Sequence, residues 1–91
     1  MNKYKIAETE SFSKKARSLS FNHLHKKILE DVYPILRKNP FFGANIKKLK
    51  GEYKDIYRFR IGNYRLFYTI DDKNSIIFII DIERRQDAYK Q

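Results

Sequence analysis

The stretch from residue 57 to residue 68, YRFRIGNYRLFY, constrains the fold more than any other part of this 91-residue chain. Apolar and polar side chains alternate on both sides of Gly62-Asn63, which is typical of two half-buried strands. A two-residue hairpin turn of this kind favours glycine at its first position. The turn also fixes the strand register, because it places Arg60 directly opposite Arg65. We therefore expect an antiparallel hairpin at the centre of the fold.

This hairpin gathers arginines on one face. Side chains alternate along a strand and cross-strand partners share a face, so Arg58, Arg60 and Arg65 point the same way. The opposite, apolar face carries Phe59, Ile61, Tyr64, Leu66 and Tyr68. Two arginines directly opposite each other repel, and the sequence offers the pair no compensating partner. Like charges directly opposite each other normally destabilise a strand pair, so their presence here indicates a site that binds a polyanion.

Composition limits the classes of function that remain. With 91 residues and 42% apolar residues, the chain is expected to form one domain over residues 1–91. The net charge of +9 points to an acidic partner, although a solvated basic coat also fits this number. Residues 47–65 hold seven basic side chains against Glu52 and Asp55, and the arginines among them favour phosphate recognition.

Several kinds of chemistry are not expected. The chain has no cysteine, which excludes disulfides, thiol catalysis and thiolate metal ligands. His23 and His25 lie nearly opposite each other on a helix, so we expect no metal and no cofactor. No apolar run reaches membrane-spanning length, and the first ten residues do not form a signal peptide. We expect a cytoplasmic protein with no membrane partner.

The first half of the chain predicts a strand and two helices. Residues 4–7 form the strand, and Thr9 caps a helix that buries Phe12, Ala16 and Leu19. A second helix opens at Ser20 or Asn22 and ends at Asn39-Pro40. Its apolar stripe consists of Leu24, Ile28, Val32, Ile35 and Leu36. Pro34 falls inside this helix and predicts a kink or an early end there.

The second half predicts strands. Residues 41–51 are a loop or a short strand, and the hairpin strands span residues 56–61 and 64–70. Residues 75–82, SIIFIIDI, are almost continuously apolar, which predicts a strand covered on both faces. The fold class is therefore α+β, with two antiparallel helices packed on one face of a twisted, mainly antiparallel sheet of four to five strands. The arginines should lie on the free face.

Three segments together resemble the RelE/ParE superfamily of toxins from type II toxin–antitoxin systems. They are LKG at residues 49–51, the hairpin at residues 57–68 and ERRQDAY at residues 83–89. The likeness is greatest to the RelE branch. It implies a ribosome-dependent endoribonuclease that cuts messenger RNA in the ribosomal A site. The implied partners are a cognate antitoxin, the ribosome and messenger RNA, with the chain a monomer or part of a complex with its antitoxin.

The resemblance also implies the catalytic residues. Arg58 and Arg60 fall where RelE has two functional lysines, and Arg65 falls on a functional arginine. Arg85 matches a later arginine and Tyr89 a terminal tyrosine. Two departures stand out. Both lysines are replaced by arginine, and Arg84 occupies a position that often holds histidine.

The implied reaction needs no metal. The 2′-hydroxyl attacks the adjacent phosphate, and arginines stabilise the charge that develops on the phosphate oxygens. Further basic residues are expected to bind RNA or the ribosome through phosphate contacts; these are Lys47, Lys48, Lys50, Lys54 and Arg84. The general base stays open between Tyr89, Glu83, Asp87 and the substrate's own phosphate.

Two other functions are compatible with the sequence. One is a ParE-like inhibitor of DNA gyrase that cleaves nothing. The other is a decayed toxin that has lost activity through the lysine-to-arginine changes and only binds its antitoxin.

Overall fold

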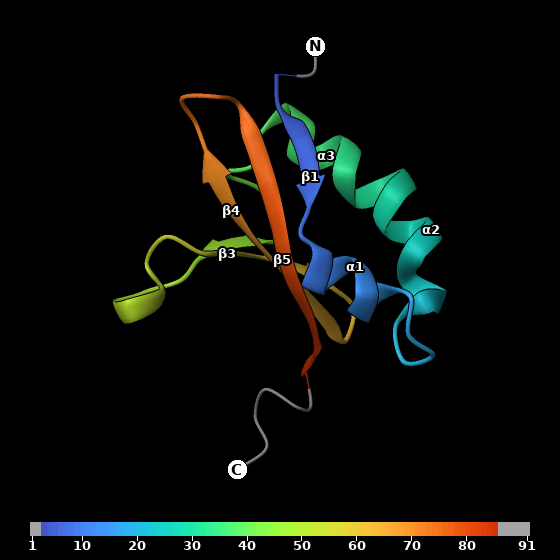
Figure 1. Cartoon of the computed structure of the whole chain (residues 1–91). Helices are drawn as coiled ribbons and strands as arrows, with labels where there is room; N and C mark the ends of the chain where they lie inside the picture. The colour runs from blue at the N-terminus through green and yellow to red at the C-terminus, as the bar shows by residue number, and fades with distance from the viewer. Residues whose placement is uncertain (1–2, 86–91) are drawn as a thin grey trace.

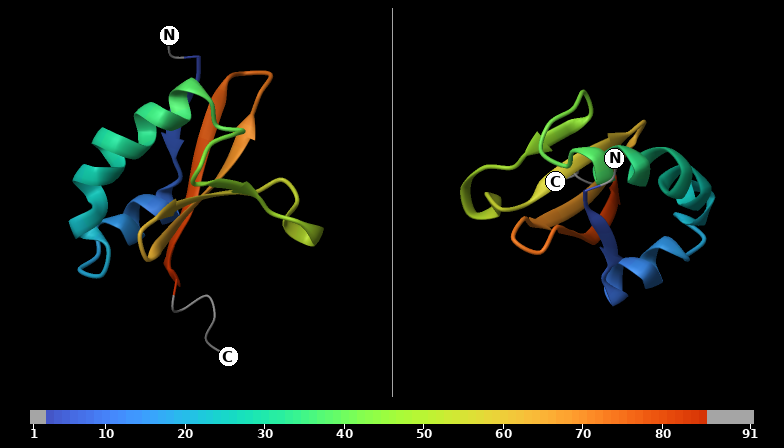
Figure 2. Two further views of the ribbon diagram at one scale, coloured as in Figure 1. Left: turned by 180° about the vertical axis from the view of Figure 1, so that it is seen from behind. Right: turned by 90° about the horizontal axis from the view of Figure 1, so that it is seen from above.

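The computed structural model describes residues 3–85, which form a five-stranded sheet with helices on one face (Figures 1 and 2). In chain order the elements are β1 (Lys5–Glu8), α1 (Glu10–Ala16), the 3-10 helix η1 (Asn22–Leu24), α2 (His25–Lys27), the π-helix η2 (Ile28–Val32), α3 (Tyr33–Lys38), β2 (Ile46–Lys48), the 3-10 helix η3 (Gly51–Tyr53), β3 (Tyr57–Ile61), β4 (Tyr64–Asp71) and β5 (Ile76–Arg84). This arrangement confirms the expected α+β class. No helix among the described residues is both long and apolar enough to span a membrane.

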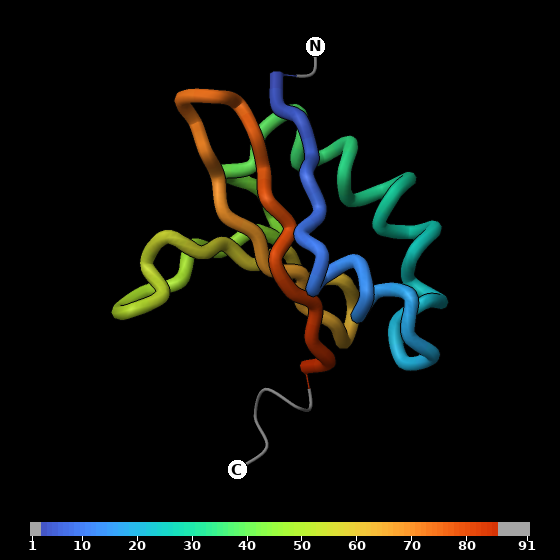
Figure 3. The backbone as a smooth tube through the Cα atoms, viewed as in Figure 1, coloured from blue at the N-terminus to red at the C-terminus, as the bar shows by residue number. Residues whose placement is uncertain are grey.

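The sheet is mixed. Its strand order is β1-β5-β4-β3-β2, in which β1 pairs with β5 in parallel and every other neighbouring pair is antiparallel. The chain therefore crosses from the β1 edge to the β2 edge through the helical layer, and the remaining strands follow back in sequence (Figure 3). The segment that contains η3 extends away from the helices (Figures 1 and 3).

The core lies between the helices and one face of the sheet. The sheet contributes alternate residues of its three longest strands, such as Phe59, Leu66 and Ile79, all less than 5% exposed. The helices contribute Phe12, Ala16, Leu24, Ile28, Val32, Tyr33 and Leu36. Two residues of the expected helical stripes are absent from this core. Leu19 is 93% exposed and Ile35 is 46% exposed.

The exposure of Leu19 follows from the early end of α1. Thr9 caps this helix as expected, since its hydroxyl accepts a hydrogen bond of 3.2 Å from the backbone N–H of Phe12. The helix ends at Ala16, and the Ser18 hydroxyl then donates to the Lys15 carbonyl at 2.7 Å. Leu19 lies beyond this end in a turn, so the prediction that it continues the buried stripe was wrong.

Pro34 produces a π-helix and no early end. The backbone N–H of Tyr33 donates to the carbonyl of Ile28, five residues back, and the helix then continues to Lys38. A wider turn removes the clash that a proline ring makes with the carbonyl four residues earlier. The extra residue per turn also rotates the helix, so that Leu36 is buried while Ile35 faces outward. Asn39 ends the helix as expected, and its side-chain oxygen accepts from the N–H of Phe41 at 3.0 Å.

The sequence predicts that β5 is covered on both faces, but the structure covers only one of them. Ile77, Ile79 and Ile82 are fully buried under the helices. On the other face, Phe78 and Ile80 are only half-buried, because no second layer covers that side. β5 is nevertheless an interior strand, which pairs with β1 on one side and with β4 on the other.

Candidate nucleic-acid interface

The β3–β4 hairpin has the register that the sequence predicts. Arg60 pairs with Arg65, and the pairs on either side continue in step. Gly62 has a positive φ of 56°, and Asn63 does not, which is the pattern of a turn that needs glycine first. The turn therefore sets which side chains of the two strands share a face.

The sheet face away from the helices carries the arginines, and we call it the arginine face. Cross-strand pairing gives it two rows of side chains. One row runs through Lys47, Arg58, Phe67 and Asp81 on four adjacent strands. The other runs through Arg60, Arg65 and Glu83 on three strands. The sequence-predicted trio Arg58, Arg60 and Arg65 is thus brought together on one face.

Arg65 lies at the middle of the shorter row and has a partner that the sequence did not reveal. Its guanidinium nitrogen is 3.5 Å from a carboxylate oxygen of Glu83, and it also lies 5.5 Å from the centre of the Phe67 ring. The prediction of two opposed arginines without compensation was therefore wrong. The carboxylate of Glu83 offsets the repulsion between Arg60 and Arg65.

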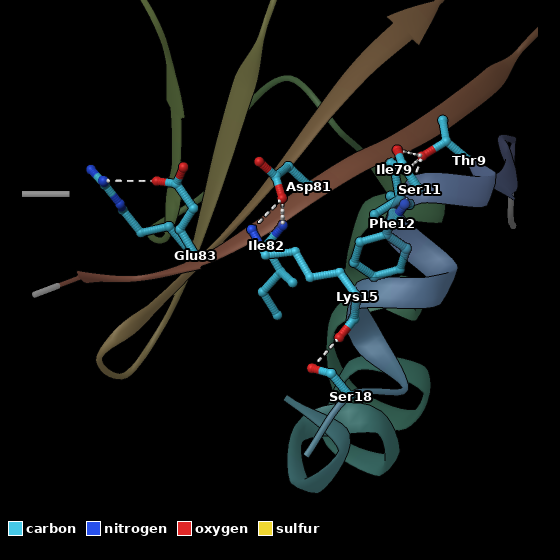
Figure 4. A network of polar contacts seen from close by, with 10 residues as sticks. Thr9, Ser11, Phe12, Lys15, Ser18, Ile79, Asp81, Ile82 and Glu83 are labelled. Carbon is cyan, nitrogen blue, oxygen red and sulfur yellow. Dashed lines mark hydrogen bonds and ion pairs between the residues drawn. The ribbon is translucent and has the colours of Figure 1, made fainter. Parts of the chain in front are cut away.

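A second ion pair joins the helical layer to the same face. Lys15 of α1 reaches Asp81 of β5 at 2.9 Å, and the same Asp81 oxygen accepts the backbone N–H of Ile82 at 2.8 Å (Figure 4). β1 pairs with β5 only as far as Ile79, so α1 can pack beside the later part of β5. Lys15 and Asp81 lie 66 residues apart, and no sequence signal connects them.

A groove of about 710 Å³ lies over this part of the arginine face. Its lining combines apolar and charged side chains, and consists of Lys15, Phe21, Leu49, Tyr53, Ile56, Arg65, Phe67, Ile80, Asp81 and Glu83. Aromatic rings beside guanidinium groups suit an unpaired nucleotide, whose base stacks while its phosphate binds the cation. Among the proposed catalytic residues within 3–85, Arg65 lines this groove.

The other sequence-predicted arginines of the described residues do not line this groove. Arg58 is half-buried and Arg60 is exposed, both on β3. Arg85 is exposed beside the hairpin turn, where its backbone N–H donates to the carbonyl of Asn63. Arg84 pairs with Tyr64, whose ring packs against His23 on the helical side, so Arg84 is separated from the arginine face. Tyr89 lies outside the described residues, as does Asp87.

The four lysines proposed to bind RNA do not form one surface. Lys47 pairs with Arg58 and shares its face, whereas Lys48 pairs with Tyr57 and lies 5.9 Å over that ring on the opposite face. Lys50 and Lys54 flank η3 and are exposed.

Three tyrosines with raised pKa values lie away from the arginine face. A hydrogen bond to Asp72, together with burial, raises the pKa of Tyr4 to about 12. Burial raises the pKa of Tyr33, whose hydroxyl also donates to Glu8, and burial likewise raises the pKa of Tyr68. Tyr68 is fully buried and donates to the Pro40 carbonyl at 2.7 Å, so it is a core residue and no stacking platform.

Comparison with known proteins gives consistent similarities. Residues 9–89 match the model of a family described as ParE toxin of type II toxin–antitoxin system, parDE. A protein of Methanocaldococcus jannaschii that carries the name toxin RelE1 is 34% identical over 89 residues, which cover 79% of this chain and 98% of the relative.

Two solved structures share the fold. The toxin–antitoxin complex RelBE2 of Mycobacterium tuberculosis has a TM-score of 0.77 at 24% identity, covering 90% of this chain and 98% of that chain. The archaeal RelE–RelB complex of Pyrococcus horikoshii has a TM-score of 0.71 at 25% identity, covering 91% and 96%.

Proposed function

Because this chain belongs to the ParE toxin family of type II toxin–antitoxin systems, within the RelE/ParE superfamily, we propose that it acts as a ribosome-dependent endoribonuclease. In this proposal it enters the ribosomal A site and cuts the messenger RNA there. It therefore works in the cytoplasm, where ribosomes translate messages.

The observation that carries the proposal is the row of charged side chains on the uncovered sheet face. Arg60 and Arg65 lie directly opposite each other, and Arg58 follows on the same face of β3. Guanidinium groups bind phosphate oxygens through paired N–H donors, and groups held in place before the reaction stabilise developing charge best. Unlike a solvated coat, this row stands beside a groove with aromatic walls.

The proposed reaction assigns a role to each arginine. The 2′-hydroxyl of one nucleotide attacks the neighbouring phosphate, which yields a 2′,3′-cyclic phosphate and a 5′-hydroxyl end. Arg65 and Arg85 would stabilise the negative charge on the phosphate oxygens, while Arg58 and Arg60 would hold the RNA backbone. Tyr89 would orient the attacking hydroxyl or stack on a base.

A cognate antitoxin would control this activity. The similar complexes from Mycobacterium tuberculosis and Pyrococcus horikoshii each contain a toxin bound to its antitoxin. For a chain with a net charge of +9, the complementary partner is an acidic or amphipathic segment that covers or distorts the basic surface.

Controlled expression tests the nuclease activity. The chain is induced from a tightly repressed promoter, and messenger RNA ends are mapped on translating ribosomes. We expect growth arrest with new 5′-hydroxyl ends inside coding regions, at the A-site codon. Intact messages and unaffected growth would exclude the proposal.

A second candidate follows from the family description itself, which names ParE. ParE-type toxins that inhibit DNA gyrase share the fold and cut no RNA. The same induction distinguishes this function, because it would give a DNA-damage response and inhibition of supercoiling while messages stay intact. Inert cells with tight antitoxin binding would instead identify a decayed toxin.

A further inference from the structure

The proposed reaction requires a group that removes the proton of the 2′-hydroxyl. Arginine, with a pKa above ~12, stays protonated and cannot accept it. Among the residues that line the groove, the carboxylates are Asp81 and Glu83, both on β5. A carboxylate on the same face as the phosphate-binding groups is a suitable proton acceptor, because it can reach the hydroxyl while they hold the phosphate.

Asp81 is committed to structure. One of its oxygens accepts from the Lys15 ammonium at 2.9 Å and from the backbone N–H of Ile82 at 2.8 Å. These two short hydrogen bonds occupy the lone pairs of this oxygen. The contact also ties α1 to β5, so Asp81 serves to position the wall of the groove (Figure 4).

Glu83 is held more loosely. Its contact with Arg65 is 3.5 Å long, compared with 2.9 Å between Asp81 and Lys15, while both carboxylates line the groove. It ends the row that begins with Arg60 and Arg65. Neighbouring strands lie about 4.8 Å apart, so a phosphate bound at Arg65 would put its attached ribose within reach of Glu83 on the next strand.

We infer that Glu83 is the general base of the proposed ribonuclease, an inference that rests on the proposed function. The Glu83 carboxylate takes the proton of the 2′-hydroxyl, and the 2′-oxygen forms a bond to phosphorus. The bond from phosphorus to the 5′-oxygen breaks, and that oxygen leaves with a proton supplied by solvent. Glu83 then returns its own proton to solvent. Arg65 thus has two roles, since it stabilises the phosphate and orients the carboxylate.

The test is single-turnover cleavage of messenger RNA on programmed ribosomes. Glu83→Gln keeps the size of the side chain and removes its basicity, and we expect the cleavage rate to fall ~10²- to 10⁴-fold. The matched control is Glu30→Gln, which makes the same chemical change at an exposed position in η2, on the opposite side of the sheet. It should cleave at the wild-type rate.

A second measurement separates a proton acceptor from a residue that only positions Arg65. In Glu83→Ala, small carboxylates added to the solution should restore cleavage, and the restored rate should rise with the basicity of the added carboxylate. A group with only a positioning role would show no such dependence. Circular dichroism and thermal melting of both variants verify that they fold.

The outcomes distinguish this inference from the proposed function. Cleavage by wild type, together with a Glu83→Gln rate within about threefold of it, would overturn the role of Glu83 and leave the ribonuclease in place. Rescue that does not follow basicity would also overturn it. If wild type cuts no message, the ribonuclease and its general base are both excluded.

Discussion

Arg65 combines three contacts on the arginine face. It faces Arg60 across the hairpin, meets Glu83 on the next strand and lies over the ring of Phe67. Its side chain is 21% exposed, so one part of the guanidinium is fixed by neighbours and another part stays open to the groove. The proposed function requires such a guanidinium, held in place before the reaction, to stabilise the transition state.

Replacing this side chain tests that role. Arg65→Ala should lower the single-turnover cleavage rate by ~10²-fold or more, the scale of removing one preorganised donor to a developing charge. Arg17→Ala is the matched control, because Arg17 is exposed at the end of α1 and away from β3 and β4. Cleavage by Arg65→Ala close to the wild-type rate would show that Arg65 does not contact the reacting phosphate.

Individual residues also show where sequence analysis reached its limit. The arginine trio could be predicted, because a two-residue turn fixes the register of the strands beside it. The Glu83 partner could not, because β4 and β5 are joined by a longer turn and their pairing shifts between Phe67 and Tyr68. A shift of one residue reverses the face of every later side chain, and nothing in the composition of β5 marks where it occurs.

Among the elements, the β3–β4 hairpin places the three arginines of the candidate site on one face. Its turn depends on the backbone conformation of Gly62. A Cβ atom at Gly62 would have no atom within 4 Å, so a larger residue meets no steric clash there. The cost of a substitution comes from the positive φ of 56°, which side chains other than glycine rarely adopt.

Gly62→Ala should therefore lower the free energy of unfolding by about 1 kcal/mol, without changing the slope of a urea titration. Asn63→Ala at the next position has no positive φ to maintain and should stay within about 0.5 kcal/mol of wild type. Equal effects of the two changes would show that the turn does not depend on the left-handed conformation at Gly62.

For the helices, the sequence predicts where they lie along the chain but not which residues of the second helix face the core. The positions of both helices could be read from Thr9, Asn39 and the apolar spacing, but the phase of the second helix could not. Pro34 allows either a break or a wider turn, and the tertiary fit of Tyr33 and Leu36 in the core selects the wider turn. The exposed Ile35 is a direct consequence of this phase change.

The molecule as a whole has a tyrosine-rich core, and this makes its stability sensitive to alkaline pH. Tyr4, Tyr33 and Tyr68 all have pKa values raised above the ordinary value of 10.0 in the folded state. Above pH 10 the unfolded chain loses these protons while the folded chain keeps them. Folding is therefore fully supported below pH 10 and weakens as pH rises further.

Thermal melting between pH 8 and pH 11.5 should thus show a constant melting temperature up to about pH 10 and a steep fall above it. Tyr68→Phe should melt lower at neutral pH, since it loses the hydrogen bond to Pro40, but its fall above pH 10 should be shallower. Tyr53→Phe is the control, because Tyr53 is 55% exposed. A fall in Tyr68→Phe as steep as that of wild type would show that this tyrosine does not titrate on unfolding.

Neighbouring lysines of β2 lie on different faces of the molecule, and the proposed binding of RNA therefore predicts different effects for them. Lys47 shares the face of Arg58, whereas Lys48 lies over Tyr57 on the other side of the same edge strand. If RNA binds only the arginine face, Lys47 releases a counterion on binding and Lys48 does not.

Ribosome affinity measured against salt concentration separates the two lysines. Lys47→Gln should weaken binding and reduce the slope of log K against log salt by roughly one, as expected for the loss of one phosphate contact. Lys48→Gln carries the same change in net charge and should keep the wild-type slope. An equal loss of slope in both variants would mean that RNA responds to the overall positive charge of the molecule. It would contradict the prediction that RNA binds only the arginine face.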